Sequence, residues 1–158
     1  MQSKYISKNK LPKLVKNLKK KKKKIVFSNG CFDLLHPGHI KILRSAKEKG
    51  DILILGINSD KSISRIKGRS RPILNQASRL EVLSAIECID YITVFCQNTP
   101  LKTIETVKPD ILVKGADWKK KDIIGADFVK NNGGKVVSIA LKKGVSTSRI
   151  IKRIRKNG

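Results

Sequence analysis

Five short apolar runs recur along this chain, and each is followed by a segment with helical periodicity. The runs lie at residues 25–27, 52–57, 91–95, 111–113 and 135–139. Short strands that are apolar throughout are typical of a parallel sheet buried on both faces. Their alternation with helices predicts a single α/β domain with a doubly wound, Rossmann-like fold, in which a five-stranded parallel sheet has the order 3-2-1-4-5.

The helices are expected at residues 40–49, 78–87, 100–107, 126–131 and 147–155. A further helical face precedes the first strand, where Leu11, Leu14, Val15 and Leu18 follow the spacing i, i+3, i+4 and i+7. We therefore divide the chain into an N-terminal basic helix (residues 1–23) and the α/β domain (residues 24–158). Packing of this helix on the domain or on a second subunit is favoured over a membrane anchor.

The net charge is +24, and residues 19–24 are six consecutive lysines. Such charge can indicate nucleic-acid binding, but aromatic residues make up only 4% of the chain, too few for a base-stacking platform. Lysine and isoleucine are abundant throughout, as a bias toward AT-rich codons would produce. We therefore expect no dedicated nucleic-acid partner. The lack of an 18-residue apolar run, of a signal-peptide pattern and of paired cysteine spacing predicts a cytoplasmic protein without membrane contact.

Both histidines of the chain lie in one short stretch, Asn-Gly-Cys-Phe-Asp-Leu-Leu-His-Pro-Gly-His at residues 29–39. It follows the first strand and opens the next helix, which is where α/β proteins bind phosphate with free backbone N–H groups. Pro37 suits a first helical turn, and Gly38 allows close approach to the backbone. His36 and His39, three residues apart, can face the same side of that turn and stabilise negative charge on a phosphate.

Two other segments are candidates for phosphate contacts. Residues 144–149, Gly-Val-Ser-Thr-Ser-Arg, place three hydroxyls where the last helix begins. Residues 65–72 form a basic stretch containing Gly68, which is either a flexible lid or a solvated loop. Arg79 is expected in the first turn of a helix, where a cation opposes the helix dipole and so favours a role in ligand binding.

No phosphate-binding loop of the Gly-x-x-x-x-Gly-Lys type, no Gly-x-Gly-x-x-Gly and no carboxylate cluster for a metal is present. No general base or activated nucleophile is evident either. Transfer to an acceptor that is already anionic, such as a phosphate monoester, needs neither. Catalysis would then consist of positioning the reactants and stabilising charge on the transferred phosphorus.

With these features, residues 25–155 resemble the small nucleotidyltransferases that carry a His-x-Gly-His motif. Within them the chain is similar to the bacterial heptose 1-phosphate adenylyltransferases, through residues 29–33, 56–60, 67–68, 71–73, 99–100, 112–115 with Asp117, 125–127 and 146–147. The resemblance implies that ATP and heptose 1-phosphate give ADP-heptose, for the lipopolysaccharide core, and pyrophosphate. Mg²⁺ would be carried by the nucleotide and no metal held by the protein alone. A homodimer is expected.

The resemblance also implies roles for individual residues. The catalytic charges would be His36, His39, Lys67 and Arg79. The nucleotide would be bound by Asn29, Gly30, Cys31, Phe32, Gly38, Gly115, Asp117, Ser146 and Thr147. The acceptor would be bound by Asp33, Asn58 and Asp60, with the first of these contacting either the acceptor or the metal.

Three alternatives remain open at this point. Glycerol 3-phosphate cytidylyltransferases share Asp-Leu-Leu-His and a Gly-x-Asp-Trp segment, but they carry an arginine shortly before Gly-Ile-Ser-Thr where this chain has Leu-Lys-Lys at 141–143. Flavin adenylyltransferase is the second alternative. A nucleic-acid-binding protein is the alternative of a different class, because of the charge.

Overall fold

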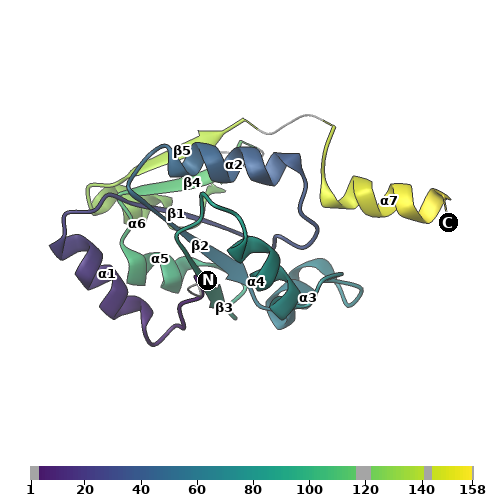
Figure 1. Cartoon of the computed structure of the whole chain (residues 1–158), viewed down its shortest axis with the longest axis horizontal. Coiled ribbons are helices and arrows are strands. Elements are labelled where there is room, and N and C mark those ends of the chain that lie inside the picture. Colours follow the sequence, from purple (N-terminus) through teal and green to yellow (C-terminus); the bar gives the residue numbers. More distant parts are fainter. Residues whose placement is uncertain (1–3, 117–121, 141–143, 158) are drawn as a thin grey trace.

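A computed structural model describes residues 4–116, 122–140 and 144–157 (Figure 1). Its five strands are β1 (Ile25–Gly30), β2 (Ile52–Asn58), β3 (Tyr91–Phe95), β4 (Ile111–Gly115) and β5 (Lys135–Ile139). They form one parallel sheet in the order β3-β2-β1-β4-β5. The fold class and the strand order predicted from the alternating pattern are both confirmed.

The helices are α1 (Leu11–Lys20), α2 (Pro37–Lys47), α3 (Asp60–Lys67), α4 (Gln76–Ser84), α5 (Leu101–Val107), α6 (Ala126–Asn131) and α7 (Thr147–Asn157). Helix α2 begins three residues earlier than its apolar pattern indicated, at the Pro-Gly pair itself. Figure 1 shows α7 at one end of the molecule, beyond the carboxyl end of the sheet.

Helix α3 corrects the prediction that residues 65–72 form a loop. The Ser59 side chain accepts a hydrogen bond from the backbone N–H of Ser62 and so caps the helix. Asp60 lies in the first turn, where a negative charge favours the helix dipole. Ile63 is fully buried. The helix continues to Lys67. Gly68, with a φ of +93°, ends the helix and begins the loop.

Two apolar clusters cover the two faces of the sheet. One contains Leu43 and Ala46 of α2 with Leu83 of α4, and the other contains residues of α1, α5 and α6. Leu11, Val15 and Leu18 are buried in the second cluster. The predicted apolar face of the N-terminal helix therefore packs on the α/β domain. No helix in the described part of the chain is long and apolar enough to span a bilayer.

The strand order places β1 and β4 side by side at the centre of the sheet. Strand β1 runs on to the histidine-bearing turn, and β4 ends at Gly115. In doubly wound sheets a ligand-binding crevice forms at this point, where the order reverses. The exposed lysines at 21–24 precede β1 and so lie at the opposite edge of the sheet.

Candidate active site

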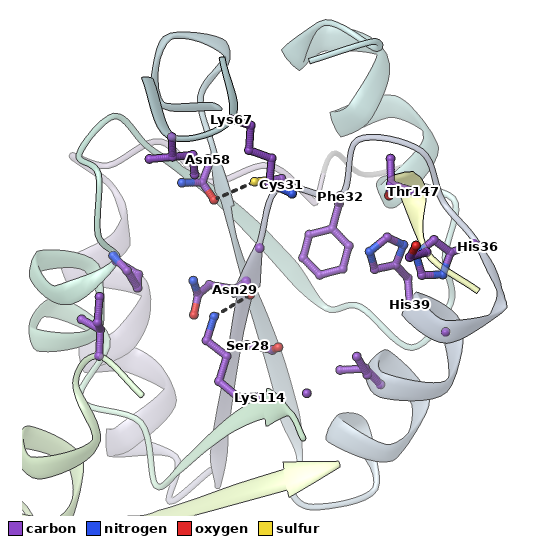
Figure 2. A pocket seen from close by; sticks show the side chains of 18 of the residues that line it. Ser28, Asn29, Cys31, Phe32, His36, His39, Asn58, Lys67, Lys114 and Thr147 are labelled. Carbon is purple, nitrogen blue, oxygen red and sulfur yellow. Dashed lines mark hydrogen bonds between the residues drawn. The ribbon is translucent and has the colours of Figure 1, made fainter. Parts of the chain in front are cut away.

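A cavity of about 450 Å³ opens at the carboxyl ends of the central strands (Figure 2). Ligand pockets in proteins commonly measure roughly 300–1,000 Å³. Its walls come from the end of β1, the start of α2, the end of α3 and the segment that opens α7. Segments more than 100 residues apart in the sequence thus meet in one crevice, as the switch-point argument predicts.

The two histidines stand against each other on one wall of this cavity. Their rings stack with centroids 3.8 Å apart and an angle of 20° between the planes. His36 is the N-cap residue of α2, and its carbonyl accepts the backbone N–H of His39 at 2.9 Å. A Cβ on Gly38 would lie 3.0 Å from the ring of His36. The glycine between the histidines therefore leaves room for the stacked pair.

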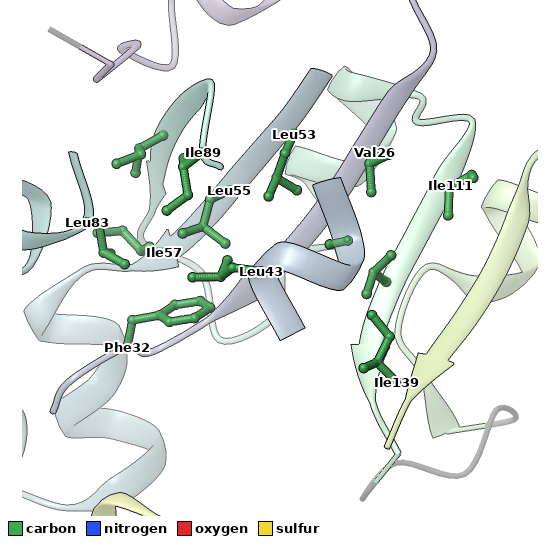
Figure 3. Close-up of a cluster of buried hydrophobic side chains, with 13 residues drawn as sticks. Val26, Phe32, Leu43, Leu53, Leu55, Ile57, Leu83, Ile89, Ile111 and Ile139 are labelled. Carbon is green, nitrogen blue, oxygen red and sulfur yellow. The ribbon is translucent and has the colours of Figure 1, made fainter. Parts of the chain in front are cut away.

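Phe32 packs beside His39, one of the two stacked histidines. Its ring centroid lies 5.0 Å from that of His39, and its side chain also belongs to the apolar cluster beneath α2 (Figure 3). Phe32 adopts a φ of +47°, which is uncommon for a residue with a side chain. The core therefore fixes the backbone at the end of β1 and thereby the position of the imidazoles.

Burial makes both histidines poor proton carriers in the free protein. It lowers the pKa of His39 to about 4, with smaller contributions from the positive charges of His36 and Lys67. Burial likewise lowers the pKa of His36 below its ordinary value, against a backbone hydrogen bond that raises it. Both rings are thus neutral near pH 7. A phosphate in the pocket would raise both pKa values, because negative charge favours the protonated form.

Several polar atoms of the site are buried without a hydrogen-bond partner in the described part of the chain. They are Nδ1 of His36, Nδ1 of His39 and Oδ1 of Asn29. Buried polar atoms in folded proteins are nearly always hydrogen bonded. All three atoms belong to residues that line the cavity, and such a concentration is typical of a polar binding site.

The remaining cavity wall carries both basic and apolar side chains. Lys67 and Lys114 line it, and no carboxylate does among the described residues. Ser146, Thr147 and Ser148 add hydroxyls where α7 begins, and the Thr147 hydroxyl donates to the Leu34 carbonyl at 3.4 Å. Phe95, Pro100, Ile123 and Ile124 add apolar side chains to the wall. The arrangement suits a ligand with a flat apolar part and an anionic part.

Twelve of the predicted site residues line this cavity. They are Asn29, Gly30, Cys31, Phe32, His36, Gly38, His39, Asn58, Lys67, Gly115, Ser146 and Thr147. Asn58 is itself fixed by a hydrogen bond from its amide to the Ser62 hydroxyl at 3.0 Å. Burial raises the pKa of the Cys31 thiol, although nearby cations, Lys67 first, oppose this. A raised pKa does not suit a nucleophile.

Three predicted ligand contacts are not on the cavity wall. The side chains of Asp33 and Arg79 are buried and hydrogen bonded to protein groups, and Asp60 is paired with Arg79 at 2.8 Å. Burial raises the pKa of Asp33, but hydrogen bonds from Leu74, Ile73 and Arg71 outweigh it and hold the pKa below its ordinary value. These three groups contact other parts of the protein, and their contacts with a ligand stay predictions. Asp117 lies outside the described residues.

Sequence reasoning also missed several wall residues. The most informative is Lys114, whose ammonium donates to the Asn29 carbonyl at 3.1 Å and joins the ends of β4 and β1. Its place at the end of a central strand, next to a glycine already singled out, was the available signal. Ile123, Ile124 and Asn98 carried no recognisable pattern, because their position depends on how the loops fold.

Comparisons with known proteins agree with this geometry. A family model described as "Cytidylyltransferase-like" matches residues 27–153. The chain belongs to the cytidylyltransferase-like family. Among its relatives, the "Bifunctional protein HldE" of Geobacter metallireducens is 51% identical over 132 residues, which cover 84% of this chain and 27% of that protein. The protein of that name from Helicobacter pylori strain Shi470 is 49% identical over 146 residues, covering 92% and 31%.

A solved structure also resembles this member of the family. It is a lipopolysaccharide core biosynthesis protein from Thermoplasma volcanium, with a TM-score of 0.61 and 31% identity, and the match covers 78% of this chain and 99% of that one. By contrast, the chain spans only about three-tenths of the length of the bifunctional relatives.

Proposed function

We propose that this protein is an adenylyltransferase that transfers AMP from ATP to a sugar 1-phosphate, heptose 1-phosphate, and releases ADP-heptose and pyrophosphate for lipopolysaccharide core synthesis. The observation that carries the proposal is the stacked pair of histidines with unsatisfied, buried nitrogens in a cavity without a described carboxylate. The name of the solved structure, a lipopolysaccharide core biosynthesis protein, supports a product used in lipopolysaccharide core synthesis.

In the proposed reaction, an oxygen of the acceptor phosphate attacks the α-phosphorus of ATP. A new P–O bond forms there, and the bond from the α-phosphorus to the bridging oxygen of the β-phosphate breaks. Pyrophosphate takes the electron pair. Because a phosphate monoester is mostly dianionic near pH 7, the acceptor needs no general base. This fits a cavity in which no carboxylate is placed to act as one among the described residues.

The protein's contribution would be positioning and charge stabilisation. His36 and His39 would donate hydrogen bonds to the oxygens of the α-phosphate and of the leaving pyrophosphate. Ser146 and Thr147 would hold the β- and γ-phosphates at the start of α7, and Lys67 would add a positive charge. The apolar side chains of the wall, among them Ile123 and Ile124, would take the adenine ring.

Mg²⁺ would reach the site bound to the nucleotide. Within the described residues there is no group of three His, Cys, Asp or Glu side chains able to hold a metal ion, so the phosphate oxygens would supply its main ligands. When bound, the ion would neutralise charge on the triphosphate. Removal of Mg²⁺ with a chelator is therefore expected to abolish turnover without unfolding the protein.

Pyrophosphate release, measured with each nucleoside triphosphate and a panel of phosphate acceptors, tests the proposal. ATP with heptose 1-phosphate is expected to be the most active pair. The panel includes CTP with glycerol 3-phosphate, because the family description names cytidylyltransferases, and ATP with flavin mononucleotide. Faster turnover of either pair would refute the substrate assignment and keep nucleotidyl transfer. Salt-sensitive DNA binding with no nucleotidyl transfer to any acceptor would refute the proposal that this protein is an adenylyltransferase.

A matched pair of lysine variants tests the cavity. Lys67→Met removes a charge that lines the cavity, whereas Lys61→Met removes a charge of the same helix, α3, that does not line it. The first is expected to lower kcat/KM by about 10²-fold, the size typical of one lost electrostatic donor. The second should leave kcat/KM unchanged. Equal effects of the two variants would place the phosphates elsewhere.

A further inference from the structure

The loop between α3 and α4 (residues 68–75, here the α3–α4 loop) is hydrogen bonded to the carboxylate of Asp33, which lies just beyond the end of β1. Asp33 accepts hydrogen bonds from the backbone N–H of Ile73 at 2.8 Å, from that of Leu74 at 2.9 Å, and from Nε of Arg71 at 2.6 Å. Arg71 Nη2 also lies 2.5 Å from the same carboxylate. The side chain of Asp33 is 1% exposed, so its oxygens are used within the protein.

A second buried side chain, Arg79, holds the same part of the loop at Leu74. The guanidinium of Arg79 is fully buried and donates to the Leu74 carbonyl at 3.2 Å, to the Cys31 carbonyl at 2.7 Å and to Asp60 at 2.8 Å. The other oxygen of Asp60 accepts the backbone N–H of Gln76 at 2.9 Å. Arg79 therefore joins the end of β1 to the α3–α4 loop and to α3.

These groups are costly to bury, which makes their placement informative. A buried charge is destabilising unless it is paired and hydrogen bonded. Well-packed apolar side chains in the place of a buried ion pair often stabilise a fold equally well or better. The network does not extend the core. It connects the end of β1 with the α3–α4 loop and with α3, and that loop continues directly from Lys67, whose side chain lines the cavity.

The loop itself supplies little to hold it in place. A Cβ on Gly68 would meet nothing within 4 Å, and residues 68–70 are exposed. Beyond the Asp33 and Arg79 contacts, the Ser64 hydroxyl donates to the Arg71 carbonyl at 2.6 Å, and the Arg71 N–H bonds to the Gly68 carbonyl. Those two bonds stay within α3 and the loop, so the connection to β1 depends on the buried ionic groups.

We infer that Asp33 is a positioning residue, which anchors the α3–α4 loop through Arg71 and thereby holds Lys67 at the phosphate end of the cavity. The inference rests on the proposed function for the role of Lys67, and on the contacts alone for the anchoring. Arg79 contributes to the same anchoring through its hydrogen bonds to the Cys31 and Leu74 carbonyls. Asp33 thus has no direct contact with the acceptor or with a metal ion.

Limited trypsin digestion of the full chain tests the anchoring without any activity measurement. Asp33→Asn replaces an acceptor with an amide whose NH₂ would face the Arg71 donors. Cleavage after Lys67 and Arg69, located by mass spectrometry, is expected to become at least about tenfold faster than in the wild type, because the loop opens locally. Unchanged cleavage at these two sites would overturn the inference.

Asp90→Asn is the matched control. Asp90 also accepts a backbone N–H, from Leu53 at 2.6 Å, and pairs with Lys47 at 2.6 Å, but it lies away from the cavity. It should lower the melting temperature without selectively exposing the α3–α4 loop. If Asp33→Asn does not fold, Arg71→Met removes the same ion pair from its more exposed partner. That variant keeps both diagnostic cleavage sites, and the same criterion applies to it.

A double-mutant cycle tests the connection to Lys67. Asp33→Asn alone is expected to lower kcat/KM for ATP by about 10- to 100-fold, whereas in the Lys67→Met background it should add less than about threefold. Full additivity would mean that Asp33 acts independently and would overturn the positioning role. If Lys67→Met itself has no effect while the loop opens in Asp33→Asn, the proposed function of Lys67 fails and the anchoring stands.

Discussion

The stability of the free protein should fall when the pH is lowered from 7 to 5, and His39 should be the main cause. Its pKa is about 4 in the folded protein, against an ordinary value of 6.5. Between these values the unfolded chain binds more protons than the native one, so the free energy of unfolding rises with pH. The contribution of His39 is complete above about pH 6.5 and is lost as the pH falls toward 4. His36 has the same sign.

The size of the effect follows from this difference. If the ring is fully shielded, lowering the pH from 7 to 5 lowers the free energy of unfolding by about 2 kcal/mol. Partial exposure of the ring reduces this loss to about 1–2 kcal/mol. For a chain of 158 residues, this corresponds to a melting temperature lower by roughly 3–6 °C. Few groups compete in this pH window, because histidine is the side chain whose ordinary pKa falls between about pH 5 and 8 and the chain has only two.

Urea unfolding at pH 5, 6 and 7, followed by circular dichroism, measures this slope in the wild type and in His39→Gln. The variant should lose most of the pH dependence. Added ATP should restore stability at pH 5 more than at pH 7, because phosphate charge favours protonated imidazole. A wild type with the same free energy of unfolding at pH 5 and pH 7 would refute the argument that burial keeps His39 neutral. So would an unchanged slope in the variant.

Three further outcomes are expected. His39→Ala should lower kcat about 10²- to 10³-fold with little change in KM, measured by pyrophosphate release, and a near-normal kcat would leave that ring a structural role only. Gly38→Ala should lower kcat while the melting temperature changes little, because its Cβ would meet the ring of His36 at 3.0 Å; full activity would show that the stacked geometry is not needed. Deletion of residues 1–20 should lower the melting temperature by several degrees, because three buried side chains of α1 are lost. It should spare kcat and weaken polyanion binding, and loss of turnover in a folded deletion variant would place this segment in the site.

The sheet could be predicted because its signal is local. Five apolar runs, such as residues 52–57, are continuous in the sequence, and the order of strands follows from general rules of chain connection. The switch point between β1 and β4 then places the histidine turn in a crevice without any reference to function. Helix α3 was missed because its signals are the Ser59 cap and the single buried Ile63. In a basic stretch these are outweighed by the Gly68 and Pro72 that follow.

The charged residues of the site show where such reasoning ends. Asp33 and Arg79 are of the right chemical type to touch phosphate or metal, and from the sequence nothing separates them from Lys67. Asp33 has a partner 38 residues away, at Arg71, and Arg79 has one 48 residues away, at the Cys31 carbonyl. Whether a charged group meets ligand or protein is decided by its burial, which depends on the whole packing of the loop. In this protein Lys67 lines the cavity, whereas Asp33 and Arg79 are buried and hydrogen bonded to the α3–α4 loop.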